Sequence, residues 1–299
     1  MTVEEVDVGG WAALDVEPMG EPGKLWLVDP AGDQWLWKPA GIQHDGRRGD
    51  FPRGEDWAEV IASAAATAIG LPAALVLPAS RDGRPGALSR DISDGRRLVH
   101  GNELIYALDS TYPAQKGGTV PGYRLERILD ALEASGVEGP ACADAPPQTA
   151  ASVFAGYLVL DAWIANQDRH HQNWGVLDDQ RGAAAPILAP TFDHGSSLGF
   201  SLHDDDKHRR LAGGQVEQWA GKGVCRPMEN QPRLVDLASQ AVHVAGAPAR
   251  HWIDRLARLS PEQQSSLLDA PPEARMSQVS RRFARAVMTT NRRRLLDGA

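Results

Sequence analysis

The chain has 299 residues, of which 42% are hydrophobic and 23% are charged, and its formal net charge is −8. This composition is that of a globular protein long enough for one large domain or for two lobes. The acidic balance excludes a nucleic-acid binder held by a general basic field, although a local basic groove is compatible with it. Because Cys142 and Cys225 form no CxxC pair, neither a disulfide framework nor a cysteine-based zinc site is expected.

The amino-terminal sequence lacks the features of a secretion signal. MTVEEVDVGG is acidic and has neither a basic segment nor an apolar core, and no apolar run in the chain approaches the length of a membrane span. We therefore predict a soluble protein located in the cytoplasm, with neither a membrane nor a nucleic acid among its partners.

The first predicted elements form a β-hairpin within residues 24–38, where KLWLVDP and QWLWK flank a Pro/Gly/Asp turn. With the two-residue period of a strand, Trp35 and Trp37 share one face, whereas Leu36 and Lys38 share the other. The chain has 31 basic residues but only five lysines, so Lys38 in an apolar strand is unusual. By itself it is weak evidence, because a lysine at a strand end is more often one that snorkels to solvent.

Residues 40–54 predict a polar, mobile loop, and the following segment predicts a helix that ends at Gly70. Its apolar residues recur at helical spacing, at Trp57, Val60, Ile61, Ala64, Ala65 and Ala68. Glu59 lies on this helix and can face either solvent or the hairpin. A strand lysine followed by a helix glutamate is the order in which kinases build the ion pair that positions the nucleotide phosphates.

Residues 74–78 and 86–90 predict a second hairpin, and the junction between two lobes is expected at residues 91–101. The predicted domains are therefore residues 1–100, a small β-rich lobe, and residues 101–299, a larger and mainly helical lobe. Helices of the second lobe are predicted at Leu125–Ala134, residues 152–164, Leu234–Val244, Ala249–Arg258, Pro261–Leu268 and Ser277–Leu296. The low-complexity stretch 136–147 predicts a surface loop. The charged stretch 201–215 is expected to be exposed and to face an acceptor substrate.

Residues 158–200 gather polar side chains between apolar runs. An apolar helix leads into NQDRHHQN, which is too polar for a core, and WGVL and PILAP predict a short hairpin before TFDHG. An acidic residue followed by Asn five positions later, and then by an Asp shortly before Gly, is the order in which kinases present their base and metal ligands. The two polar segments are therefore expected to converge.

Phosphoryl transfer requires a cation that neutralises charge and a positioned nucleophile. Magnesium prefers oxygen ligands and retains several waters, so we predict Asn173 and Asp193 as its ligands. Asp168 is predicted to accept or orient the proton of the acceptor hydroxyl. Further predicted site residues are Arg169 and His170, which hold the loop or screen its charge, Asp161 and Asn166, which hydrogen-bond its backbone, and Gly195, which permits a tight turn after Asp193.

A metal-dependent hydrolase would use the same region differently. Zinc or a nuclease metal can be ligated by histidine and carboxylate groups, here His170, His171, His194 and Asp168. Adjacent histidines in an extended loop do not readily point at one ion, however, and the chain contains no HExxH motif. This alternative also leaves the strand lysine and the helix glutamate unexplained.

The motif N-x-D-R-H-x-x-N at Asn166–Asn173, followed by P-T-F-D-H-G-S-S-L-G at Pro190–Gly199, resembles the HipA-like kinases. It is more distantly similar to the phosphatidylinositol 3- and 4-kinases. The likeness continues upstream in AEVIASAAATAIGLP at residues 58–72, in GALSRDI and in HGNELI. The resemblance implies an α+β, two-lobed protein-kinase-like fold that uses ATP and magnesium, with ATP bound by the first lobe.

The resemblance also implies individual roles. Lys38 would contact the phosphates with Glu59 as its partner, Asp168 would be catalytic, and Asn173 and Asp193 would hold the metal. Two departures from the family pattern are visible. The glycines around MGEPGK are too sparse for a clear phosphate loop, and residues 1–22 are too few for the additional amino-terminal domain that HipA toxins usually carry, so the chain resembles a stand-alone kinase core.

The sequence thus favours an ATP- and magnesium-dependent phosphotransferase whose acceptor is an unidentified hydroxyl, most simply that of a Ser or Thr in a protein. Two alternatives remain open at this point. One is a nucleotide-binding pseudokinase with a regulatory role, and the other is a kinase that acts on a small molecule or a lipid.

Overall fold

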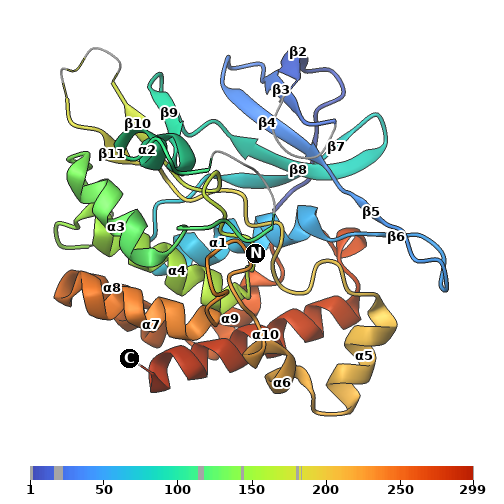
Figure 1. Ribbon diagram of the computed structural model, residues 1–299. Helices are drawn as coiled ribbons and strands as arrows, with labels where there is room; N and C mark the ends of the chain where they lie inside the picture. The colour runs from blue at the N-terminus through green and yellow to red at the C-terminus, as the bar shows by residue number, and fades with distance from the viewer. Residues whose placement is uncertain are drawn as a thin grey trace.

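The computed structural model describes residues 3–16, 23–113, 118–142, 145–179, 182 and 184–298. It has two lobes, an upper one of β-strands with a single long helix and a lower one that is mainly helical (Figure 1). The predicted α+β, two-lobed fold class is therefore confirmed.

The upper lobe is built on a six-stranded sheet of order β1-β7-β8-β4-β3-β2, in which β1 and β7 are parallel and all other neighbours antiparallel. Its strands are β1 (Val6–Asp7), β2 (Ala12–Val16), β3 (Leu25–Val28), β4 (Gln34–Pro39), β7 (Val76–Arg81) and β8 (Arg84–Arg90). The two predicted hairpins are β3–β4 and β7–β8. The strands β1 and β2 were not predicted, because β1 has only two residues and β2 is an exposed edge strand without a buried face.

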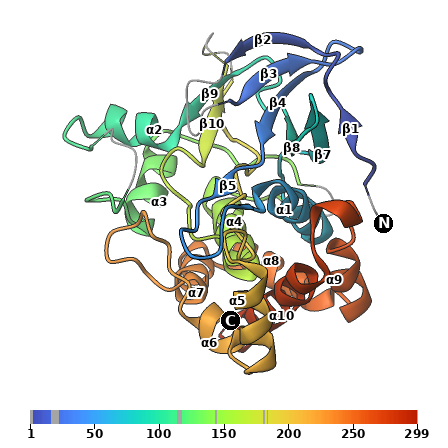
Figure 2. The same ribbon diagram turned by 90° about the vertical axis from the view of Figure 1, so that its right-hand side faces the viewer.

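The two faces of β4 have different surroundings, as the two-residue period predicts. Trp35 and Trp37 are buried on the outer face with Val8 and Leu27, whereas Lys38 lies on the inner face beside α1 (Glu55–Ile69). This helix lies beneath the sheet and packs against β7 and β8 (Figure 2). It ends at Gly70, whose φ of 78° is in the left-handed region that glycine tolerates.

The segment 40–54 contains secondary structure that was not predicted, whereas its mobility stays a prediction. It contains a short hairpin of β5 (Ile42–Gln43) and β6 (Phe51–Pro52), which are too short to show a periodic pattern. The Gly54 amide donates to the carbonyl of Phe200 at 3.0 Å. The Arg48 guanidinium binds both carboxylate oxygens of Asp206, at 2.8 and 3.2 Å. The hairpin is thus attached to the lower lobe.

The lower lobe is organised around α4 (Ala150–Ile164), in which every residue except Ala151 is buried. The helix packs against α7, α8 and α10, consistent with its broadly apolar sequence. The other helices of this lobe are α2 (Gly101–Leu108), α3 (Leu125–Ala134), α5 (Asp204–Ala212), α6 (Val216–Gly221), α7 (Leu234–Ala245), α8 (Ala247–Arg258), α9 (Pro261–Leu267), the 3₁₀ turn η1 (Glu273–Arg275) and α10 (Gln278–Asp297). The predicted helices are all present, whereas α5, α6 and η1 were not predicted.

A small three-stranded sheet lies at the junction of the lobes. It contains β9 (Arg97–His100), β10 (Gly175–Asp178) and β11 (Ile187–Leu188), in the order β11-β10-β9. The strand β9 falls within the predicted junction and pairs with a strand of the second lobe. The division of the chain at residue 100 stays a prediction.

The charged stretch 201–215 forms α5 and is only partly exposed. Lys207 is 3% exposed, donates to Ser280 Oγ at 2.7 Å and lies over the ring of Trp57. The expectation that this whole stretch is exposed is therefore wrong for Lys207, which anchors α5 to α10 and α1.

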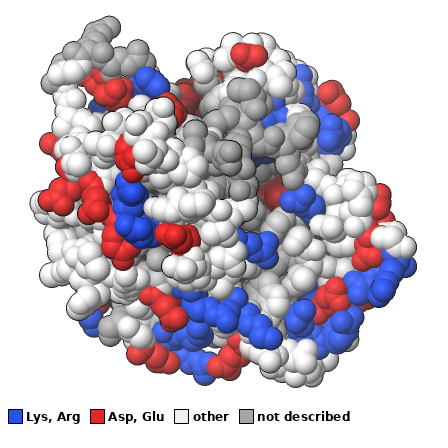
Figure 3. All heavy atoms as spheres, in the orientation of Figure 1, with Lys and Arg blue, Asp and Glu red and all other residues white. Residues whose placement is uncertain are grey.

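Charged side chains of both signs are interspersed on the face shown in Figure 3, and basic ones gather over its lower part, where α5, α6 and α10 lie. The negative net charge therefore coexists with a locally basic surface. Within the described ranges, no helix has the length and apolar character that crossing a membrane requires.

Candidate active site

Three charged residues from distant parts of the chain meet between the lobes. The Lys38 ammonium donates to Glu59 Oε1 at 3.0 Å and to Asp193 Oδ1 at 2.9 Å. Lys38 comes from β4, Glu59 from α1, and Asp193 from the segment after β11 in the second lobe. The lysine therefore joins the upper lobe to the acidic Gly-containing turn of the lower lobe.

Glu59 faces the hairpin, one of the two orientations that the sequence left open. Its side chain is only 4% exposed, and both of its carboxylate oxygens have partners. Oε1 accepts from Lys38, and Oε2 accepts from the backbone amide of His194 at 2.9 Å. The helix is thus connected directly to the turn that carries Asp193.

Asp193 is held in an unusual conformation. Its φ is 61°, a left-handed value that few residues other than glycine adopt, although aspartate is among the more tolerant. Its side chain is 34% exposed, so part of the carboxylate is open to the cavities. Burial by itself raises the pKa of Asp193, but the nearby Lys38 ammonium, with Lys24 further away, outweighs it and holds the pKa well below its usual range.

The same contacts act on Lys38 in the opposite sense. Burial lowers its pKa, whereas the carboxylates of Asp193 and Glu59 raise it more strongly, and the net pKa lies above the ordinary lysine value. Lys38 is therefore an ammonium ion at neutral pH. The carboxyl groups of Glu59 and Asp168 both lie close enough to Asp193 to be affected by its negative charge, and a bound metal ion would reduce this repulsion.

A buried ion pair supports the polar loop of residues 166–173. Arg169 donates to both carboxylate oxygens of Asp161, at 2.7 and 2.8 Å, and also to the carbonyl of Asn173. Asn166 donates to Asp161 at 2.8 Å. Asp161 and Arg169 are each 1% exposed, so the pair lies behind the loop rather than in a cavity.

Asp168 and Asn173 lie five positions apart in this loop and are linked by a hydrogen bond. The Asp168 amide donates to Asn166 Oδ1 at 3.2 Å, and Asn173 Nδ2 donates to the Asp168 carbonyl at 2.8 Å. Asn173 Oδ1 accepts no hydrogen bond from a described residue, so it is available to a ligand. Burial, together with the negative charge of Asp193, raises the pKa of the Asp168 carboxyl to about 6.

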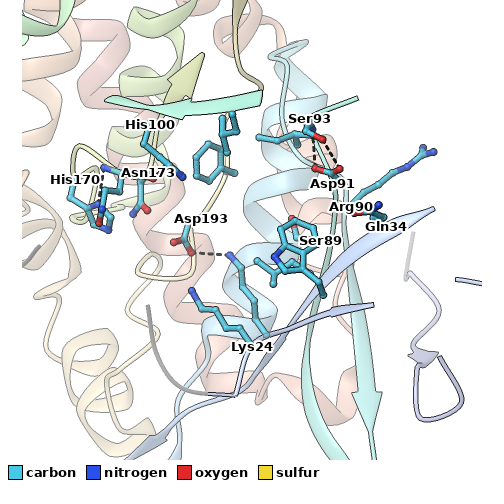
Figure 4. Close-up of a pocket in the computed structure, with 17 residues that line it drawn as sticks. Lys24, Gln34, Ser89, Arg90, Asp91, Ser93, His100, His170, Asn173 and Asp193 are labelled. Atoms are coloured by element: carbon cyan, nitrogen blue, oxygen red, sulfur yellow. Dashed lines mark hydrogen bonds and ion pairs between the residues drawn. The ribbon is translucent and has the colours of Figure 1, made fainter. Parts of the chain in front are cut away.

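Two cavities meet at Lys38 and Asp193. The first, of about 370 Å³, has apolar walls from Trp26, Leu36, Leu98 and Phe192 and is also lined by Asn173 (Figure 4). The second, of about 300 Å³, is lined by charged and polar residues, among them Lys24, Lys38, Arg53, Asp168, His170, Asp193 and Ser196. His170 lines both cavities. An apolar compartment beside a charged one suits a ligand with an aromatic part and an anionic part.

Lys24 is a residue of this region that the sequence analysis missed. It lies at the start of β3, lines both cavities, and its side chain extends toward Asp193 (Figure 4). The rarity of lysine in the chain and the preceding Gly23, with a φ of 93°, are the signals that could have found it. Gly20, the other glycine considered for a phosphate loop, lies outside the described residues.

The structural role of Gly195 differs from the predicted one, which was to permit a tight turn after Asp193. Its φ is not in the left-handed region, which is occupied by Asp193 itself. A Cβ at Gly195 would lie 3.1 Å from Glu55 Cβ at the start of α1. The glycine therefore permits close approach of the turn to α1 rather than the turn itself.

The histidines do not form a metal site. His171 pairs with the Tyr112 hydroxyl at 2.9 Å and His194 with the Thr191 hydroxyl at 2.8 Å, and both are buried. Among the residues that the structure describes, no three His, Cys, Asp or Glu side chains lie together as metal ligands. The donors that fit a metal are oxygens of Asp193 and Asn173, which both line the first cavity. A set of one or two protein oxygens completed by phosphates and waters is what magnesium uses.

The two lobes and the lysine, glutamate and aspartate that meet between them define a protein-kinase-like fold. Solved structures share it. CtkA, a proinflammatory kinase of Helicobacter pylori, is similar with a TM-score of 0.69 and 18% identity, over 99% of this chain and 97% of its own.

Two further structures are similar at lower TM-scores. HipA of Shewanella oneidensis MR-1, solved with HipB and its operator DNA, has a TM-score of 0.52 and 13% identity, over 98% of this chain and 65% of its own. A Golgi casein kinase with manganese and ADP bound has a TM-score of 0.51 and 13% identity, over 99% of this chain and 73% of its own. No protein-family model and no curated protein matches the sequence. At these low identities, the structural similarity shows a shared fold alone.

Proposed function

We propose that this protein is an ATP- and magnesium-dependent phosphotransferase of the HipA-like type, which transfers the γ-phosphoryl group to a Ser or Thr hydroxyl of a protein. The observation that carries the proposal is the contact of Lys38 with both Glu59 and Asp193. A lysine on the sheet, paired with a helix glutamate and facing the metal-binding aspartate, is the arrangement that kinases require before transfer.

The nucleotide would occupy both cavities. Its base fits the apolar walls of the first cavity, and its phosphates would extend toward Lys38 and Lys24. Oxygens of Asp193 and Asn173 would hold magnesium, which neutralises charge on the phosphates when bound. We assign to Lys24 the phosphate contact for which the sequence offered no clear glycine-rich loop.

Asp168 would orient the acceptor. Its carboxylate accepts the hydroxyl proton as the acceptor oxygen forms a bond to the γ-phosphorus and the bond from that phosphorus to the ADP oxygen breaks. The support of Asp168 by Asn166 and Asn173 holds it in place. We propose a positioning role for Arg169 and Asp161, whose buried ion pair fixes the loop from behind.

The structural neighbours support the assignment to the kinase-type phosphotransferases. The Golgi casein kinase was solved with manganese and ADP, which is consistent with the use of a nucleotide and a divalent metal by this fold. We also propose residues 1–100 and 101–299 as the two lobes, and a cytoplasmic location. The more distant resemblance to phosphatidylinositol kinases stays a prediction.

The test is transfer of label from γ-labelled ATP to a mixture of proteins or to the chain itself, with and without magnesium. We expect magnesium-dependent incorporation, and about a 10²- to 10⁴-fold loss in Asp168→Asn, because the amide cannot accept the proton. Binding of magnesium and ATP should persist in this variant. Nucleotide binding by the wild type without any incorporation would support a pseudokinase instead, and absence of nucleotide binding would refute both.

The raised pKa of Asp168 predicts a pH dependence. Since the carboxyl acts only when deprotonated, kcat/KM for ATP should rise with pH through about 6 and fall roughly tenfold per pH unit below it. Initial rates measured between about pH 5 and pH 8 at constant ionic strength would show this fall as the acid limb of the pH–rate profile. The limb should be absent from the residual activity of Asp168→Asn. A rate that is flat across this range in the wild type would contradict the assigned role.

A further inference from the structure

A third cavity lies beside Asp168, and none of the roles assigned so far uses it. Its volume is about 280 Å³, and its lining includes Gln167, Phe200, Trp219 and Arg226. Asp168 and Ser196 line both this cavity and the second one. An acceptor side chain placed here would therefore lie beside Asp168 and next to the second cavity.

The backbone of Arg226 is fixed relative to Asp168. The Arg226 amide donates to the carbonyl of Gln167, the residue before Asp168, at 3.0 Å, and its carbonyl accepts from Thr119 Oγ1 at 3.1 Å. The neighbouring Cys225 and Pro227 are buried. The guanidinium thus projects from a rigid position on the rim of the cavity.

The side chain of Arg226 is exposed and makes no hydrogen bond or ion pair with a described residue. Its positive charge acts on Asp168, whose pKa it lowers in opposition to burial and Asp193. Arg169, by contrast, is paired with the carboxylate of Asp161. An unpaired guanidinium beside the predicted base is therefore available to a ligand.

The other walls of the cavity are preformed. Trp219 on α6 packs edge-to-face on Phe283, with ring centroids 5.1 Å apart, and Arg53 lies over the ring of Phe200. The lining combines the aromatic rings of Phe200 and Trp219 with polar side chains, and Arg226 is the basic residue among those described there. A guanidinium beside aromatic walls suits an acidic side chain of a partner segment.

We infer that Arg226 recognises an acidic side chain close to the acceptor hydroxyl, so that the acceptor is a Ser or Thr that lies within about two residues of an Asp or Glu in a protein segment. This inference rests on the proposed phosphotransferase function and adds the class of its acceptor. The cavity, of about 280 Å³, has room for a side chain that protrudes from a larger partner.

The inference can be tested with peptide libraries in which a central Ser or Thr is flanked by randomised positions. With magnesium and γ-labelled ATP, we expect peptides with Asp or Glu within about two residues of the acceptor to be labelled roughly tenfold faster than their Asn or Gln counterparts. Equal labelling of the two sets would overturn the inference and leave the phosphotransferase proposal standing. Absence of label in every peptide and in the protein itself would overturn both.

Arg226→Glu is the decisive variant, and Lys222→Glu is its matched control. Lys222 is an exposed lysine at the end of α6 that does not line the cavity, and its substitution changes the net charge equally. We expect Arg226→Glu to lose or invert the preference for acidic peptides, Arg226→Lys to retain part of it, and Lys222→Glu to keep it. If Arg226 only screens Asp168, its substitution will shift the acid limb of the pH profile and leave the peptide preference intact, which would refute the inference.

Discussion

Asp193→Asn is expected to lower magnesium-dependent phosphoryl transfer by about 10³-fold or more. The substitution replaces the partly exposed carboxylate, which Lys38 keeps ionised, with a neutral amide that holds a divalent cation poorly. The effect should appear both in kcat and in the magnesium concentration that gives half-maximal rate. Rates measured with γ-labelled ATP over a range of magnesium concentrations would check it.

The fold should survive this substitution. Lys38 keeps its contact with Glu59 at 3.0 Å, so no buried charge loses its only partner. Lys24→Met provides a useful contrast, because it removes a proposed phosphate contact without touching the metal ligands. It should raise the KM for ATP and leave the magnesium dependence unchanged. Magnesium-dependent turnover by Asp193→Asn at near wild-type rates would refute the assignment of Asp193 as a metal ligand.

Asp161→Ala should destabilise the protein by about 3–5 kcal/mol. The substitution leaves the Arg169 guanidinium buried without its counter-ion, and also removes the acceptor of the Asn166 amide. Burial of an uncompensated charge costs more than the ion pair itself contributes to stability. Chemical denaturation monitored by tryptophan fluorescence would measure the free energy of unfolding.

The exposed pair between Arg293 and Glu217 provides the control. These side chains are 57% and 66% exposed, so Arg293→Ala should change the free energy of unfolding by less than about 1 kcal/mol. If Asp161→Ala is no more destabilising than Arg293→Ala, the 166–173 loop does not depend on the buried pair. If Asp161→Ala is destabilised yet retains full activity at low temperature, Asp161 and Arg169 do not position Asp168 for catalysis.

The predictable part of the fold consists of elements that carry a local signal. In β4 the tryptophans Trp35 and Trp37 alternate with Leu36 and Lys38, which is the two-residue period of a strand. The apolar residues of α1 recur at helical spacing, and Ser260 with Pro261 marks the start of α9. The structure adds a capping box there, formed by Ser260 and Gln263, which was not predicted. These signals depend only on residues a few positions apart.

The elements that were missed lack such a signal. The strands β5 and β6 have two residues each and are defined by their pairing and by the attachment of the hairpin to Phe200 and Asp206. Arg226 is an ordinary cation in the sequence, and Lys24 carries only the weak signal of a rare residue type. The cavities that their side chains line show why both matter.

The sequence by itself determined the order of Lys38, Glu59, Asp168, Asn173 and Asp193, and with it the prediction of a two-lobed kinase-like fold. Only the tertiary structure decided that Lys38 contacts both Glu59 and Asp193, although Asp193 follows Lys38 by 155 positions in the sequence. It also decided that Arg169 is buried behind the loop that holds Asp168. The physical reason is that residue type and local period determine which face of an element a side chain occupies. Which other element that face meets depends on packing between parts of the chain that are far apart in sequence.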